Sequence, residues 1–139
     1  MKKREPVSKI MSTNLLTINS TNTLFDVKDI FEEKKVRHLP VVSGDKVVGM
    51  LSKTDFTRAS YGVGQKDVQE KVNEALFHTL KISDIMTEEL VTIKSDALIH
   101  EVAGIFAENQ FHALPVVDDG KLKGIVTTTD IIKYLLEQY

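Results

Sequence analysis

The sequence contains no cysteine and no tryptophan, and only three of its 139 residues are proline. Without cysteine the chain has no disulfide, no thiolate nucleophile and no sulfur ligand for zinc, which is typical of the reducing cytoplasm. No apolar run approaches the roughly 18 residues of a membrane helix, and the basic start Met1–Arg4 is not followed by the apolar stretch of a signal peptide. We therefore expect a soluble, cytoplasmic protein that begins near Met1.

An excess of charge of one sign is also absent. The 18 basic and 20 acidic side chains leave a net charge of −2, so no general field attracts nucleic acid or a membrane surface. Hydrophobic residues make up 42% of the chain and charged residues 27%, as in ordinary globular domains. This composition is compatible with a small anionic ligand that is held locally.

A long internal repeat is the main feature that the sequence does contain. When the sequence is shifted by 75 residues, positions 7–56 align with positions 82–131 without a gap, and nineteen of the fifty pairs are identical. Leu39–Val42, for example, recurs unchanged as Leu114–Val117. The chain therefore holds two copies of one supersecondary unit.

Each copy has the pattern β-α-β-β-α: an apolar strand, an amphipathic helix, two β-branched strands joined by a polar turn, and a final helix. The first copy gives strand 15–18, a helix around 24–31, strands 39–42 and 47–51, and a helix from about residue 53. The second copy gives strand 90–93, a helix around 99–106, strands 114–117 and 122–126, and a helix from about residue 128. We expect an α+β fold in which the two repeats pack about a pseudo-two-fold axis, because one copy alone buries too little core.

The connection between the copies is expected to be helical. We predict that the first repeat spans residues 1–64 and that the second repeat, preceded by a connecting helix, spans residues 65–139. The helix is indicated by five apolar positions, Val68, Val72, Ala75, Leu76 and Leu80. A solvated linker is the alternative, since a short helix is marginal without packing.

The residues that could carry chemistry lie where the last strand of each copy meets the final helix. They read Gly49-Met50-Leu51-Ser52-Lys53-Thr54-Asp55 and Gly124-Ile125-Val126-Thr127-Thr128-Thr129-Asp130. A hydroxyl three residues before an acid is first of all a helix capping box. The same geometry also suits a nucleotide, because a helix start favours phosphate, hydroxyls donate to its oxygens and a carboxylate accepts both hydroxyls of a ribose. Glycine at 49 and 124 leaves space for a ligand or a neighbouring strand.

Both copies contain, in the same order, the motifs Ile-Met, Thr-Ile, Leu-Pro-Val-Val and Gly-x-x-(Ser/Thr)-x-Thr-Asp. This series of motifs resembles that of the CBS (cystathionine-β-synthase) domain family. The resemblance covers nearly the whole chain. Within the family, the chain is similar to the stand-alone paired modules of Bateman type. It implies two clefts that bind AMP, ADP, ATP or a related adenosine compound. It also implies a homodimer that acts on a protein target, which the sequence does not identify.

In this family each cleft combines the acid of one copy with the base-lining residues of the other. The resemblance implies a first cleft made of Ser52, Thr54, Asp55, Met86, Val91, Phe111, His112 and Ala113. It implies a second cleft made of Met11, Leu16, Val36, Arg37, His38, Thr127, Thr129 and Asp130. The apolar members are also compatible with a plain core role. We expect the second cleft to bind a phosphorylated nucleoside more tightly, because Arg37 is permanently charged and can bind phosphate through two donors.

Motifs for catalysis or metal binding are missing. The four histidines form no i, i+4 pair, and the sequence has no calcium loop, no Gly-x-Ser-x-Gly elbow and no Walker loop. Because no nucleophile has a positioned base, we expect no enzyme, no catalytic cofactor and no metal. Two hypotheses remain: a nucleotide-binding regulatory module, and a structural dimerisation or partner-docking module without a nucleotide.

Overall fold

The computed structural model describes residues 4–60 and 77–139 of the chain. The chain divides into two compact units, of which one is Leu16–Glu89 and the other combines Met1–Leu15 with Leu90–Tyr139. We call them the 16–89 unit and the 90–139 unit. The predicted repeat boundary at residue 64 and most of the predicted connecting helix lie outside the described residues, so both stay predictions.

The 16–89 unit contains a three-stranded sheet in the order β1-β2-β3. Strand β1 (Ile18–Asn19) runs parallel to β2 (His38–Ser43), and β2 pairs antiparallel with β3 (Lys46–Ser52). The described part of this unit includes the helices α1 (Leu24–Glu33), α2 (Lys53–Ser60) and α4 (Ile82–Ile85). The buried core consists of Ile18, Leu24, Val27, Phe31, Leu39, Val41, Leu51, Phe56, Phe77 and Ile82.

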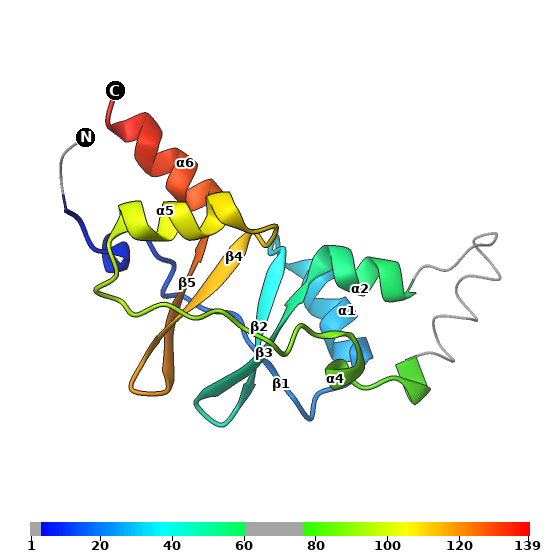
Figure 1. The fold of residues 1–139 in the computed structure, drawn as a ribbon. Helices are drawn as coiled ribbons and strands as arrows, with labels where there is room; N and C mark the ends of the chain where they lie inside the picture. The colour runs from blue at the N-terminus through cyan, green and yellow to red at the C-terminus, as the bar shows by residue number, and fades with distance from the viewer. Residues whose placement is uncertain (1–3, 61–76) are drawn as a thin grey trace. The chain divides into compact units, whose positions relative to one another are not determined.

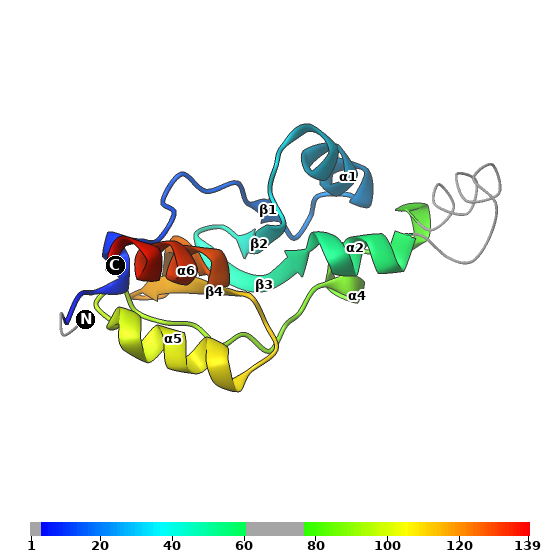
Figure 2. The same ribbon diagram turned by 90° about the horizontal axis from the view of Figure 1, so that it is seen from above.

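The 90–139 unit contains an antiparallel hairpin of β4 (Ala113–Asp118) and β5 (Lys121–Thr127). Helices α5 (Ile99–Glu108) and α6 (Thr128–Glu137) lie side by side over this hairpin (Figure 1 and Figure 2). A 3₁₀ helix, η1 (Val7–Lys9), completes the unit. The buried core consists of Val7, Ile93, Ile99, Val102, Phe106, Leu114, Val116, Val126, Ile131 and Tyr134.

Each hairpin is closed by a two-residue turn of the kind that matches the twist of the strands. In the first turn Gly44 has φ +66°, the left-handed conformation that a type II′ turn requires at its first central position. In the second turn Asp119 and Gly120 have φ +52° and +79°, as a type I′ turn requires. The predicted hairpins are therefore confirmed, together with their polar turns.

The leading strand of each repeat is shorter than the apolar pattern predicts. The predicted strand 15–18 is reduced to β1, and the predicted strand 90–93 to a single parallel bridge between Ile93 and Val116. Ile18 and Ile93 are buried, whereas Leu16 and Val91 are exposed to 37% and 45%. Leu16 and Val91 therefore lie outside the buried core.

The leading segments of the two repeats are exchanged between the units. Ser12 of the first repeat exchanges two backbone hydrogen bonds with Ile125 of the second, at 2.8 and 3.0 Å. Thr87 of the second repeat forms the equivalent pair with Met50 of the first, at 2.8 and 3.0 Å. Each unit therefore combines the body of one repeat with the beginning of the other.

A side-chain bridge links the segment before α5 to the end of β4. Asp118 Oδ1 accepts the Ser95 backbone N–H at 3.0 Å. Hydrogen bonds from Ser95 hold the pKa of the Asp118 carboxyl below its ordinary 3.8; the bond from the hydroxyl has the largest effect and the bond from the backbone N–H the next largest. The positive charges of Lys123 and Lys94 lower the pKa by smaller amounts. Because the pKa is depressed by folding, the stabilisation is present above the unfolded pKa and is lost as the pH falls through the folded one.

We expect Asp118→Asn to lower the melting temperature at pH 7, because the carboxylate that accepts from Ser95 is removed. The difference from wild type should shrink as the pH falls from about 4, near the unfolded pKa, through the lower folded pKa, below which the wild-type carboxyl is protonated in both states. Thermal unfolding between pH 2.5 and 7 measures the difference in melting temperature between the variant and the wild type. Asp119→Asn in the adjacent turn is the control. A difference that does not depend on pH would show that the charge of Asp118 is not its source.

Candidate functional site

The start of α2 carries one half of the predicted capping box. Ser52 Oγ accepts the Asp55 N–H at 3.0 Å, and the Lys53 N–H donates to the Arg37 carbonyl at 2.7 Å. The Asp55 carboxylate is turned along the helix, where its Oδ1 lies 3.4 Å from Arg58 Nη1. Arg58 was not among the predicted site residues, although the i, i+3 spacing of an acid and a base on a helix is a signal for such a pair.

The start of α6 carries the complete capping box. Thr127 Oγ1 accepts the Asp130 N–H at 3.2 Å, and Asp130 Oδ2 accepts the Thr127 N–H at 2.9 Å. The Thr128 N–H donates to the His112 carbonyl at 3.0 Å, as Lys53 does to Arg37 in α2. The capping interpretation of the motif is therefore confirmed, fully at α6 and partly at α2.

Capping leaves a small set of groups available for a ligand at each helix start. Of the first three helical N–H groups, only those of Thr54 and Thr129 have no partner among the residues that the structure describes. Both threonine side chains are exposed. Each acid also keeps one carboxylate oxygen without a hydrogen bond within the described ranges 4–60 and 77–139. One N–H, one hydroxyl and one carboxylate oxygen per helix start can therefore face a sugar phosphate.

The sheet register places the residues before each Leu-Pro pair beside the helix start of the same unit. His38 is paired with Ser52 across β2 and β3, and Ala113 with Thr127 across β4 and β5. Arg37 and His112 are exposed at these two places, whereas Ala113 is buried. The 16–89 unit therefore carries the more cationic helix start, since Lys53 and Arg37 stand where the 90–139 unit has Thr128 and His112.

Each predicted cleft draws residues from both compact units, so its assembly across them stays a prediction. The 16–89 unit contains Leu16, Val36, Arg37, His38, Ser52, Thr54, Asp55 and Met86. The 90–139 unit contains Met11, Val91, Phe111, His112, Ala113, Thr127, Thr129 and Asp130. Val36 and Met86 pack against the core of the first unit, and Met11 and Phe111 against that of the second. These four apolar side chains therefore have a core role in the structure.

The two buried glycines of the motif accommodate methionine side chains. A Cβ added to Gly49 would lie 2.9 Å from Met86 Cγ, and one added to Gly124 would lie 2.8 Å from Met11 Sδ. Both methionines come from the exchanged leading segments. The sequence predicted that either a ligand or a neighbouring strand fills the space beside these glycines. The structure shows that a neighbouring segment of the chain fills it.

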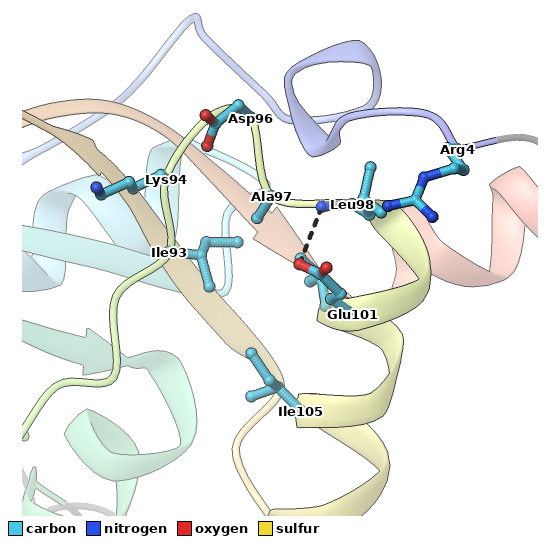
Figure 3. Close-up of a pocket in the computed structure, with 9 residues that line it drawn as sticks. Arg4, Ile93, Lys94, Asp96, Ala97, Leu98, Glu101 and Ile105 are labelled. Atoms are coloured by element: carbon cyan, nitrogen blue, oxygen red, sulfur yellow. Dashed lines mark hydrogen bonds between the residues drawn. The ribbon is translucent and has the colours of Figure 1, made fainter.

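A separate hollow of about 520 Å³ lies between the start of α5 and residues 93–98 (Figure 3). Its wall is mainly aliphatic and its rim carries both signs of charge. The lining residues are Arg4, Ile93, Lys94, Asp96, Ala97, Leu98, Glu101, Val102 and Ile105. Glu101 Oε2 accepts the Leu98 N–H at 3.4 Å in this wall (Figure 3). None of the predicted nucleotide-binding residues lines this hollow.

The part of the chain that the structure describes holds neither a metal-binding cluster nor a membrane-spanning helix. Within residues 4–60 and 77–139, no three His, Asp or Glu side chains are gathered as a metal site would need. The same part of the chain has no helix that is long and apolar enough to span a bilayer.

Comparison with known proteins gives a family and several solved structures. The family model described as CBS domain matches residues 7–62 and 82–137. Protein MJ1225 of Methanocaldococcus jannaschii is 29% identical over 132 residues, which cover 94% of this chain and 43% of MJ1225. Its crystal structure, proposed as an archaeal homolog of g-AMPK, aligns with a TM-score of 0.80 over 97% of this chain and 49% of that one. The chain spans 43% and 36% of the first two curated relatives that it matches.

Two solved structures of similar length contain adenosine compounds. The complex of CBSX2 with AMP is 28% identical, has a TM-score of 0.78 and covers 95% of this chain and 97% of that chain. CBSX2 itself comes from Arabidopsis thaliana. The CBS domain pair of protein MJ0100, in complex with 5-methylthioadenosine and S-adenosyl-L-methionine, is 26% identical, has a TM-score of 0.76 and covers 99% of this chain and 100% of that chain.

Proposed function

Because the chain belongs to the CBS domain family, we propose that it is a regulatory module that binds an adenine nucleotide. AMP, ADP or ATP binds in the two predicted clefts and changes how the chain, as a homodimer, meets a protein target. The module is not an enzyme. The single observation that carries this proposal is the duplicated helix start, at which one N–H, one hydroxyl and one carboxylate oxygen remain available beside each cap.

Adenosine is supported as the common part of the ligand by what the neighbouring structures contain. AMP, 5-methylthioadenosine and S-adenosyl-L-methionine share the base and the sugar and differ at the 5′ substituent. A carboxylate that accepts from the two ribose hydroxyls, here Asp55 or Asp130, reads the shared part. The exposed Leu16 and Val91 suit the faces of the base, since both are apolar and neither is used by the core.

The residues that the family resemblance assigns to each cleft support different affinities for the phosphate. The second cleft, with Thr127, Thr129 and Asp130, would include Arg37 and His38 from the other repeat. The guanidinium of Arg37 can bind a phosphate through two parallel donors, which His112 cannot do when its imidazole is neutral. The second cleft is therefore the tighter one for AMP.

We expect Asp130→Ala to weaken the tighter phase of AMP binding about tenfold, which corresponds to about 1.4 kcal/mol. Asp55→Ala should weaken only the looser phase, and isothermal titration calorimetry with AMP separates the two. Removal of Asp130 also removes a helix cap, so the control is Asp26→Ala in α1, where Asp26 Oδ2 accepts the Thr23 N–H at 3.0 Å in the same kind of box. Asp26→Ala should leave AMP binding unchanged.

A structural dimerisation or docking module is the competing function. Ligand that binds the native state raises its stability by RT ln(1 + [L]/Kd), so a thermal scan decides between the two. A melting temperature that stays constant with millimolar AMP, ADP, ATP, NAD and S-adenosylmethionine would favour the structural module.

A larger loss of AMP affinity in Asp55→Ala than in Asp130→Ala would reverse the ranking of the clefts.

A further inference from the structure

The hollow at the start of α5 has a wall that the first repeat does not reproduce. Ala97 and Leu98 line it, and the residues 75 positions earlier are Asn22 and Thr23. In the first repeat these polar side chains close the equivalent place: Asn22 Nδ2 donates to Asp26 Oδ2 at 3.1 Å, and Thr23 Oγ1 accepts the Asp26 N–H at 3.2 Å. The aliphatic side chains of the second repeat cannot form these hydrogen bonds.

Leu98 is an unfavourable residue for its position in the helix. It is the N-cap of α5, and its side chain forms no capping hydrogen bond. Leucine is among the poor N-caps, whereas threonine, which the first repeat has here, is a good one. The Leu98 side chain is only partly buried. A residue that weakens its own helix without filling the core is expected where a surface serves a ligand.

Two opposite charges with free donors and acceptors stand at this end of the hollow. The Glu5 carbonyl accepts the Ile99 N–H at 2.9 Å, which holds the chain beside Arg4 at the start of α5. Arg4 has no ion pair within residues 4–60 and 77–139. In the same described ranges Glu101 uses only Oε2, for the Leu98 N–H, and both side chains line the hollow (Figure 3).

The remaining rim charges balance each other. Lys94 and Asp96 carry one charge of each sign, as Arg4 and Glu101 do, so the lining has no net charge. Such a rim favours a zwitterion over a simple anion or cation, because each charged group of the ligand can meet its opposite. The aliphatic wall favours an apolar side chain on the same molecule.

We propose that the hollow binds a free α-amino acid with a branched aliphatic side chain, such as leucine. The guanidinium of Arg4 donates to the α-carboxylate through two parallel N–H groups. The carboxylate of Glu101 accepts from the α-ammonium group, and the side chain of the amino acid packs against Ile93 and Ile105. The volume of about 520 Å³ lies within the roughly 300–1,000 Å³ of small-molecule sites. The site shares no residue with the two predicted nucleotide clefts, so it goes beyond the proposed function.

The first test compares ligands by amide NMR titration of the whole chain. L-leucine should bind with a dissociation constant of about 1 mM, since so small a ligand makes few contacts. It should shift the amide signals of Leu98 and Glu101 but not those of Thr23 and Asp26. Isocaproate lacks the ammonium group, isoamylamine the carboxylate and glycine the side chain, so each should bind at least about tenfold more weakly. The absence of shifts at Leu98 and Glu101, or equal binding of isocaproate, would overturn the proposal.

The second test gives the hollow the residues of the first repeat. Ala97→Asn/Leu98→Thr should keep or raise the melting temperature, because it supplies the missing cap. It should nevertheless weaken leucine binding at least about tenfold, since the wall becomes polar. A loss of binding in a variant that is no less stable cannot be attributed to unfolding. Unchanged leucine binding in this variant would contradict the assignment of the wall.

Single substitutions test the two charges separately. Arg4→Ala and Glu101→Gln should each weaken leucine binding at least about fivefold. Glu108→Gln is the control, because Glu108 is exposed at the other end of α5 and does not line the hollow. AMP titration of Ala97→Asn/Leu98→Thr should match the wild type. A wild-type chain that binds leucine but not AMP would remove the proposed function and leave this site standing.

Discussion

Gly124→Ala is expected to destabilise the chain by about 2–4 kcal/mol, because overpacking and the loss of backbone hydrogen bonds add to each other. The new Cβ would lie 2.8 Å from Met11 Sδ and 2.9 Å from the Ser12 carbonyl oxygen. Met11 can change its rotamer, but Ser12 is held by two hydrogen bonds to the backbone of Ile125. The leading segment therefore has to separate from β5, and urea denaturation at pH 7 measures the cost.

The matched substitution in the other repeat should cost less. The three atoms nearest to a Cβ on Gly49 all belong to the flexible Met86 side chain, so we expect Gly49→Ala to cost below about 1.5 kcal/mol. Gly104→Ala in α5 is the control for the added methyl group. Apart from its chain neighbours and the nearby backbone of the helix, no atom lies within 4 Å of its Cβ position, so the substitution should stabilise the helix by about 0.5–1 kcal/mol. Equal losses in Gly124→Ala and Gly49→Ala would show that the Ser12 backbone is not the cause.

The second large effect is expected for Phe56, whose replacement by alanine should cost about 3–5 kcal/mol. Its ring lies 5.6 Å from that of Phe31 and 5.7 Å from that of Phe77, and Phe77 in turn packs edge-on against Phe25 at 5.0 Å. Phe56 is 5% exposed and links α2 to α1 and to the segment that begins at Phe77. Removing it leaves a cavity that the neighbouring rings, which pack at tilted and edge-on angles, cannot easily close.

The companion variant for this position is Phe56→Ile, since the second repeat has Ile131 at the equivalent position. It keeps most of the buried volume and should cost less than about 1.5 kcal/mol. Guanidinium unfolding followed by circular dichroism compares the variants. A loss below 1.5 kcal/mol in Phe56→Ala would mean that the neighbouring phenylalanines refill the space.

The regular parts of the fold could be predicted from the sequence because local periodicity determines them. The strand predicted at 39–42 lies inside β2, and the helices predicted to start near residues 53 and 128 begin as α2 at Lys53 and α6 at Thr128. The hydroxyl and acid of each motif were correctly placed at a helix start. The family and the two tandem repeats were correctly predicted as well.

Features that depend on long-range packing could not be predicted in this way. The two leading segments have nearly the same pattern, so nothing in the periodicity says which sheet each of them joins. The different orientations of the Asp55 and Asp130 carboxylates could not be predicted either. The two motifs have the same pattern, and the orientation depends on a neighbouring residue outside the motif. That neighbour is Arg58 in the first repeat, where the second has Lys133. Assembly of the clefts across the two units remains a prediction.

The exchange of leading segments has a consequence for the order in which the protein matures during synthesis. The 16–89 unit is continuous in sequence, so all of its residues are translated before residues 90–139. Ser12 is translated before that unit, yet its hydrogen-bonding partner Ile125 is translated more than a hundred residues later. The segment that precedes the 16–89 unit is therefore made before that unit but finds its native contacts after it, and until then Val7 has no partner core to enter.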